Sequence, residues 1–136
     1  MRVFRVVPLL LGVCLTAVGC SALAADPYAD DVRRAELVGR WRAASCDAEL
    51  RLDADGSARV TRLPTSMEYG EVLRSRSGSG TWDIGRLGED PKLDVRVKHA
   101  GESLDLLRHD GRLVVQMFVG DPDNGDDCRF TRQRSR

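Results

Sequence analysis

The chain has 136 residues, enough for one domain, and its 21 basic and 21 acidic side chains give a formal net charge of 0. No block of basic residues stands out, which argues against nucleic acid as a partner. The sequence contains no G-x-S-x-G motif, no glycine-rich phosphate loop and no paired-cysteine motif. We therefore expect a non-catalytic protein without a cofactor.

The first 19 residues have the pattern of a secretory signal. Arg2 and Arg5 form a short basic region, and an apolar run follows from Val6 to Val18. A helix needs roughly 20 residues to cross a bilayer, so this run is too short for a span and suits the core of a signal peptide. The alternative, a buried N-terminal strand or helix, is disfavoured because Pro8 and Gly12 interrupt the run.

Two cleavage sites overlap where this segment ends. Ala22-Leu23-Ala24 is an A-x-A site, which would release a soluble protein that begins at Ala25. The stretch L-T-A-V-G-C, which ends at Cys20, resembles the lipobox of small bacterial lipoproteins, although Ala17 stands where leucine is usual. We favour this second site. The resemblance implies that Cys20 becomes the N-terminus and carries a diacylglyceryl group, with acyl chains such as palmitate that hold it at a membrane.

Export also determines how the cysteines are interpreted. Cys14 leaves with the signal and Cys20 carries the lipid, so Cys46 and Cys128 remain as a pair in an oxidising compartment. We expect them to form a disulfide, and two free buried thiols are the alternative. Loss of Arg2 and Arg5 would leave 19 basic and 21 acidic side chains, a formal charge of about −2.

Residues 20–31 are expected to form a lipidated tether, and residues 32–136 a single domain. Asp30 or Asp31 is expected to cap a helical turn over residues 32–36. From Leu37 onward apolar and polar residues alternate with a period of two, which predicts strands. Eight strands are expected, over residues 37–43, 50–53, 58–61, 80–84, 93–98, 104–107, 113–119 and 128–132.

One long segment departs from the alternation. Pro64 is expected to end the third strand, and the following fifteen residues, Thr65 to Ser79, lack a clear strand pattern. Loops of this length are uncommon in compact domains and are often functional. The segment is therefore predicted to be a loop or lid, with Met67 and Tyr69 as apolar side chains available to a ligand.

Eight strands joined in succession predict an all-β fold, an antiparallel up-and-down barrel or a strongly curled meander. In a closed barrel the end of the first strand lies beside the start of the last, and Cys46 and Cys128 occupy those places. The predicted interior is densely apolar, which favours a barrel filled by its own side chains over a hollow one. The inward candidates are Leu50, Leu52, Val60, Trp82, Ile84, Leu93, Val95, Val97, Leu104, Leu106, Leu113, Val115, Met117 and Phe130.

Gly39-Arg40-Trp41 resembles the G-x-W signature of lipocalin-like barrels, and Gly80-Thr81-Trp82 repeats it. The likeness extends over about residues 36–132 to small bacterial secreted lipoproteins, which end near a Gly-Asp-Pro-Asp-x-Gly turn, as residues 120–125 do. The resemblance implies a barrel in which Trp41 closes one end. The candidate ligand-binding residues are Trp41, Met67, Tyr69 and Trp82.

Metal sites are not expected. Asp121, Asp123, Asp126 and Asp127 invite a calcium interpretation, but the spacing departs from an EF-hand loop and suits a tight turn. If the fifth and sixth strands pair around Ala100-Gly101, His99 faces Glu102 and His109 faces Lys92. The two histidines would then lie roughly 23 Å apart, too far to share one metal.

Two functions are compatible with these observations. The first is an exported, lipid-anchored binding protein that takes a small apolar or amphipathic ligand at the barrel mouth, under the Thr65 to Ser79 lid. The second is a non-catalytic scaffold or inhibitor that contacts another envelope protein through its outer face or loops. An open pocket above Trp41 favours the first, and a dry, filled barrel favours the second.

Overall fold

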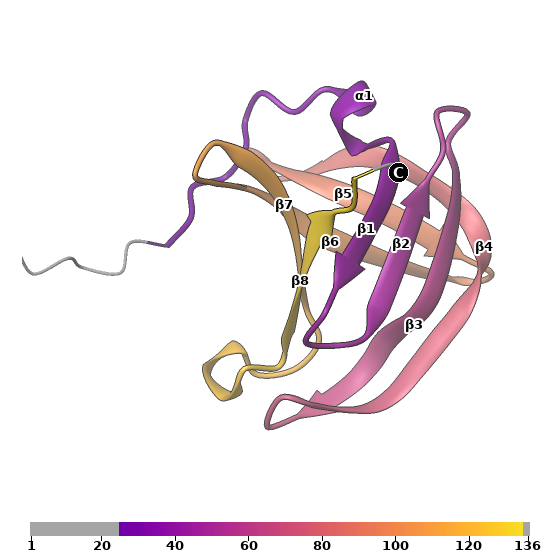
Figure 1. Ribbon diagram of the computed structural model, residues 1–136, viewed down its shortest axis with the longest axis vertical. Coiled ribbons are helices and arrows are strands. Elements are labelled where there is room, and N and C mark those ends of the chain that lie inside the picture. The colour runs from indigo at the N-terminus through magenta and orange to yellow at the C-terminus, as the bar shows by residue number, and fades with distance from the viewer. Residues whose placement is uncertain (1–24, 135–136) are drawn as a thin grey trace, which may run out of the picture.

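The period-two alternation produces eight antiparallel strands, paired in chain order, with the last strand returning to the first (Figure 1). The structure, a computed structural model, describes residues 25–134. It confirms the predicted all-β up-and-down barrel and shows that the barrel is closed. The strands are β1 (Gly39–Ala43), β2 (Ala48–Leu52), β3 (Ser57–Glu68), β4 (Glu71–Leu87), β5 (Asp90–Val97), β6 (Ala100–His109), β7 (Arg112–Phe118) and β8 (Asp127–Arg132).

The seam between β1 and β8 closes the barrel. Its ladder has only two residue pairs, Trp41 with Arg132 and Arg42 with Thr131. The Gln133 backbone N–H extends it by donating to the Arg40 carbonyl oxygen at 2.8 Å. At the other end of the seam, a disulfide joins Cys46 to Cys128, whose Cα atoms are 5.9 Å apart. The predicted disulfide is therefore confirmed, and it joins the end of β1 to the start of β8.

The inward side chains of all eight strands meet in one apolar cluster. Twelve of the fourteen predicted inward residues are buried, whereas Ile84 and Leu113 are only half-buried. Trp41, Leu37 and Leu63 add large side chains that are fully buried. Burying one such side chain contributes roughly 1.5–3 kcal/mol relative to leaving it in water, so this cluster is the main source of stability.

Two glycines of the G-x-W repeats have different structural roles. Gly39 has a φ of +140°, a conformation that L side chains rarely adopt. At Gly80 the backbones of β4 and β5 approach so closely that an added Cβ would lie 1.8 Å from the Arg96 carbonyl oxygen. Both tryptophans that follow point into the core and donate their indole N–H to a backbone carbonyl, Trp41 to Leu37 and Trp82 to Asp53, each at 2.8 Å.

The short helix α1 (Arg34–Leu37) covers the end of the barrel near Trp41 (Figure 1). It begins later than predicted, and its N-cap is Arg33 rather than Asp30 or Asp31. The Asp31 carboxylate instead forms an ion pair with Arg108 at 3.2 Å. No helix among residues 25–134 has the length and apolar character needed to cross a lipid bilayer.

The prediction of a loop or lid from Thr65 to Ser79 was wrong. These residues form the far halves of β3 and β4, which project as a long hairpin beyond the rest of the barrel (Figure 1). Pro64 pairs with Ser75 between two register shifts of the β3–β4 ladder, and bulges of this kind are where a proline is tolerated within a strand. Arg62 takes a positive φ of 51° there, and its N–H donates to the Ser77 hydroxyl at 2.9 Å.

The segment before α1 is bound to the barrel over part of the expected tether. Pro27 and Ala29 form backbone hydrogen bonds with Arg108 and Leu106, at 2.9 and 2.8 Å, along an edge of β6 that β5 leaves unpaired. Beneath them Lys92 forms an ion pair with Asp105. The earlier part of the tether, with Cys20 and the signal segment, lies outside the described residues.

Loss of the disulfide should lower stability substantially. In the loop-entropy model a bridge that closes a loop of this length contributes about 4–5 kcal/mol to the free energy of unfolding. We expect Cys128→Ser to lower the urea midpoint of unfolding. A Cys46→Ser/Cys128→Ser variant should have the same lowered midpoint, because both variants lack the bridge. Reducing agent should shift the midpoint of the wild-type protein but not of the double variant. Equal midpoints for the oxidised wild-type protein and both variants would contradict this role.

Candidate ligand-binding groove

The four residues proposed for ligand binding lie at opposite ends of the barrel. Trp41 and Trp82 are buried near α1 and the β2–β3 turn, where their indole N–H groups donate to backbone carbonyls. Met67 is buried at the other end, with its sulfur 3.7 Å from the Cys128 sulfur. Tyr69 lies in the β3–β4 turn and is 76% exposed. No single site can contain all four.

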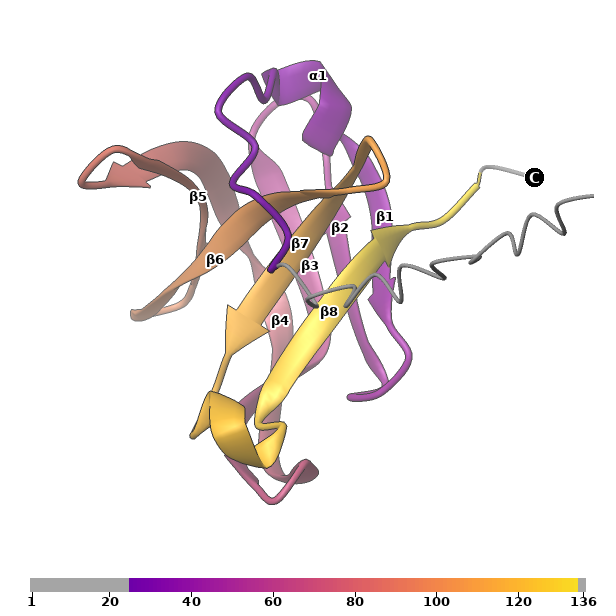
Figure 2. The ribbon, with the colours of Figure 1, turned by 90° about the vertical axis from the view of Figure 1, so that its left-hand side faces the viewer.

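A groove opens beside Trp41, between the start of β7 and the end of β8. The β7–β8 ladder stops at the pair Val115–Phe130, and the two strands then separate toward the α1 end (Figure 2). The resulting groove has a volume of about 900 Å³. Residues from α1, β1, the β6–β7 hairpin, β8 and the following segment line it: Glu36, Trp41, Arg108, His109, Arg112, Leu113, Val114, Arg129, Thr131, Arg132, Gln133 and Arg134.

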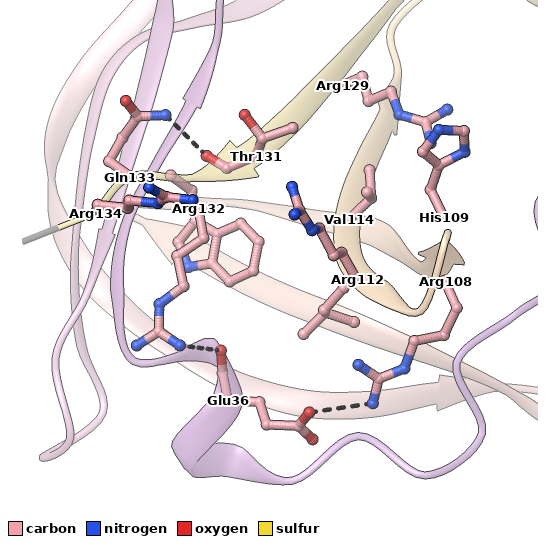
Figure 3. A pocket seen from close by; sticks show the side chains of 12 residues that line it. Glu36, Arg108, His109, Arg112, Val114, Arg129, Thr131, Arg132, Gln133 and Arg134 are labelled. Atoms are coloured by element: carbon pink, nitrogen blue, oxygen red, sulfur yellow. Dashed lines mark hydrogen bonds and ion pairs between the residues drawn. The ribbon is translucent and has the colours of Figure 1, made fainter.

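The groove combines apolar and polar surfaces. Leu113, which is half-buried, provides the accessible apolar side chain, and Trp41 and Val114 lie behind it, only 1% and 4% exposed. The rest of the lining is polar and predominantly basic, and Glu36 is its only carboxylate among residues 25–134. Figure 3 shows the labelled basic side chains placed around the opening, with Arg112 in the middle of the view. Such a surface suits a molecule with an apolar part and a polar or charged part.

Glu36 and Arg108 form an ion pair on one side of the groove, 3.1 Å apart (Figure 3). The Glu36 carboxylate also accepts the Arg33 backbone N–H at 2.9 Å. This backbone hydrogen bond, followed by that from Arg108, lowers the pKa of Glu36. Arg108 also reaches Asp31, and its pKa is raised because both carboxylates stabilise its charged form, Glu36 most. The positive charge of Arg108 is thus neutralised by carboxylates of the protein itself.

Asp26 connects the N-terminal segment to the opposite side of the groove. Its carboxylate, 18% exposed, contacts His109 at 2.8 Å and forms an ion pair with Arg129. The hydrogen bond to His109 and then that to Arg129 lower the pKa of Asp26 below its ordinary value of 3.8. His109 and Arg129 therefore hold the segment against the outer face of β6 to β8.

Arg132 is oriented by backbone atoms rather than by a carboxylate. Its guanidinium donates to the Val38 carbonyl at 2.7 Å and to the Glu36 carbonyl at 3.5 Å, where α1 ends. Within residues 25–134, none of Arg112, Arg132 and Arg134 forms an ion pair with a carboxylate. No local sequence pattern points to these three arginines, because they are not close to Trp41 in the chain.

The histidine register differs from the prediction. β5 ends at Val97 and β6 begins at Ala100, so the turn falls at Lys98-His99, where Lys98 takes a positive φ of 58°. Lys92 therefore pairs with Asp105, whereas His109 pairs with Arg112 across β6 and β7. Among the residues that the structure describes, no three His, Cys, Asp or Glu side chains are placed to hold a metal ion.

Two aspartates near the β7–β8 turn accept hydrogen bonds from backbone N–H groups. The Asp121 carboxylate accepts the Asp123 N–H at 3.0 Å at the start of the short helix η1 (Pro122–Asn124). Asp126 is buried and accepts the Gly70 N–H at 2.7 Å and the Asp121 N–H at 3.2 Å. Asp126 thus links this turn to the tip of the β3–β4 hairpin.

Comparisons of the chain with models of protein families, with curated proteins and with solved structures found no match. The fold is an eight-stranded antiparallel barrel, and the chain is assigned to no family. The function of the groove therefore has to be inferred from the residues that line it.

The contacts of Asp26 should make part of the stability dependent on pH. Because the pKa of Asp26 is lower in the folded state, its contribution is present above the ordinary value of 3.8 and is lost as the pH falls through the lowered value. We expect Asp26→Asn to lower the urea midpoint at about pH 6, and its difference from wild type to shrink by about pH 3. Asp30→Asn, at an exposed neighbouring position, is the matched control. A difference that does not change with pH would contradict this role.

Proposed function

We propose that this protein is an exported, non-catalytic binding protein that takes a small apolar or amphipathic molecule in the groove beside Trp41. The observation that carries the proposal is the groove itself, with a volume of about 900 Å³, an apolar part and a polar rim. Pockets for small ligands typically measure roughly 300–1,000 Å³ and combine apolar lining with a few polar groups. The volume of the groove falls in this range, whereas its lining is more polar than usual, which favours an amphipathic ligand.

This site differs from the predicted one at the barrel mouth. The lid that would have covered the mouth is the β3–β4 hairpin, and large apolar side chains occupy the barrel interior. The proposed ligand therefore lies beside the barrel end, between β7 and β8, rather than along the barrel axis. Trp41 is the one residue of the predicted ligand set that lines this groove.

The disulfide points to an oxidising, extracytoplasmic compartment, because such bridges are rare where thiols are kept reduced. Membrane attachment through lipid on Cys20 belongs to the proposal and rests on the likeness of its flanking residues to a lipobox. Cleavage near Ala24 would instead give a secreted protein.

A scaffold or inhibitor that contacts another envelope protein is the second candidate. The filled interior favours it, and so does the projecting β3–β4 hairpin, on which Tyr69 and Leu73 are exposed. Crosslinking from this hairpin in intact cells tests this candidate. Recovery of one specific envelope protein, lost in a Tyr69→Ser/Leu73→Ser variant, would favour it over ligand binding.

Filling the groove should abolish ligand binding while leaving the fold intact. Thr131 is exposed and lines the groove, so Thr131→Trp places a large side chain in the opening. Ser75→Trp, at an exposed position on β4, is the matched control. We expect amphiphiles with single alkyl chains to raise the melting temperature of wild type and Ser75→Trp, but not of Thr131→Trp, because a ligand that binds the native state stabilises it. Equal responses of all three proteins would contradict the groove as the site.

Mass spectrometry before and after denaturation distinguishes a covalent lipid on Cys20 from a non-covalently bound ligand. We expect the protein purified from its own cells to retain added mass after denaturation, which a covalent lipid requires, and to lack residues 1–19. Added mass that is lost on denaturation would report a non-covalent ligand. Cys20→Ser should remove the first addition and not the second. An N-terminus at Ala25 would contradict the lipid anchor and leave the proposed binding function intact.

A further inference from the structure

We propose that the ligand of the groove carries an anionic phosphate-type headgroup, which the guanidinium groups of Arg112 and Arg132 recognise. This inference rests on the proposed binding function and specifies its ligand class. The ligand is an amphiphile whose alkyl part lies against the half-buried Leu113, beside the buried Trp41 and Val114.

The balance of charge in the groove is the first support. Among residues 25–134, six basic residues line it, five arginines and His109, whereas Glu36 is the only acidic one. The chain as a whole has equal numbers of basic and acidic side chains. The excess of positive charge is therefore local. A concave surface lined by one sign of charge raises the local concentration of ligands of the opposite sign.

The availability of these charges is the second support. Arg108 is engaged by Glu36 and Asp31, and Arg129 by Asp26. In the part of the chain that the structure describes, the Arg112 side chain makes no hydrogen bond or ion pair. This side chain is exposed and lines the groove. The protein thus neutralises Arg108 and Arg129 and leaves Arg112 available to a ligand.

Arg132 is both charged and held in position. Hydrogen bonds to the Val38 and Glu36 carbonyls orient its guanidinium without neutralising it. A guanidinium has five N–H donors, so further donors remain for a ligand. Arg132 also lies directly across the β1–β8 ladder from Trp41, which places a cation next to the apolar part of the groove. The planar, forked arrangement of donors in arginine suits the oxygens of phosphate.

The position of the N-terminal segment bears on the source of the headgroup. Asp26 is held by His109 and Arg129, which line the groove. Under the proposed anchor, Cys20 precedes Ala25 by five residues, which span at most about 18 Å. The groove would then lie near the headgroups of the membrane. The same phosphate chemistry can come from a bilayer lipid or from a free amphiphile, so the experiment includes both.

The test uses three probes with the same alkyl chain and different headgroups: dodecyl phosphate, dodecyl maltoside and dodecyltrimethylammonium. Binding to the purified full chain is measured by calorimetry below the micelle concentration of each probe. We expect dodecyl phosphate to bind at least tenfold more tightly than the other two, a difference of about 1.4 kcal/mol, and to weaken as salt is added. Inorganic phosphate alone should bind more weakly than dodecyl phosphate, because it lacks the apolar part.

Arg112→Gln should weaken dodecyl phosphate about tenfold and leave dodecyl maltoside unchanged, because it removes the charge and keeps a polar side chain. Arg59→Gln is the matched control, since Arg59 is exposed on β3, away from the groove. An unchanged urea midpoint in both variants excludes a general loss of folding. Arg132→Gln should also weaken dodecyl phosphate, but its contacts with α1 make Arg112→Gln the decisive variant.

Two negative results have different meanings. Equal binding of dodecyl phosphate and dodecyl maltoside, unaffected by Arg112→Gln, would overturn the anionic headgroup and leave the binding function intact. Failure of all three probes to bind would overturn the binding function itself. If dodecyl phosphate binds as expected, sedimentation with phosphatidylcholine vesicles that contain phosphatidylglycerol identifies the source. Arg112-dependent sedimentation supports a bilayer headgroup, and its absence supports a free phosphorylated amphiphile.

Discussion

Closure of the barrel between β1 and β8 is the constraint on which the rest of the structure depends. Every other pair of neighbouring strands is adjacent in the chain, whereas this seam joins the first strand to the last. The seam has two ladder pairs, and the disulfide between Cys46 and Cys128 fixes its other end. Bringing distant segments together costs conformational entropy. The disulfide lowers this cost because it already restricts the conformations of the unfolded chain. Closure also covers the edges of β1 and β8, which would otherwise be free to pair with other chains.

The same seam produces the groove. β8 pairs with β7 from Asp127 to Phe130, and its last two residues, Thr131 and Arg132, pair with β1. The start of β7 is left without a partner on that side, so Leu113 and Val114 line an opening instead of a continuous sheet. Closing the barrel and opening the groove are therefore two results of one stagger between the ladders of β8. The same stagger places Arg132 next to α1.

Electrostatic contacts organise the surroundings of the groove. Asp31 and Glu36 engage Arg108, and Asp26 engages Arg129 and His109, so carboxylates from the N-terminal region hold the outer basic side chains. These contacts also attach the N-terminal segment and α1 to the barrel. Arg112, Arg132 and Arg134 remain without a carboxylate partner among residues 25–134. Because some basic side chains of the groove pair with carboxylates and others do not, the groove keeps a positive charge.

The class of fold, most of the core and the disulfide could be predicted from the sequence alone. Strands such as residues 93–98 alternate cleanly because each is buried on one face, and that signal is local. It did not reveal the β3–β4 hairpin, because Pro64 and the bulge at Arg62 break the alternation, and only pairing with β4 restores a continuous strand. The groove follows from the tertiary structure alone. Its arginines come from β6, β7, β8 and the segment after β8, and they become neighbours of Trp41 through strand register and barrel closure, which no local pattern contains.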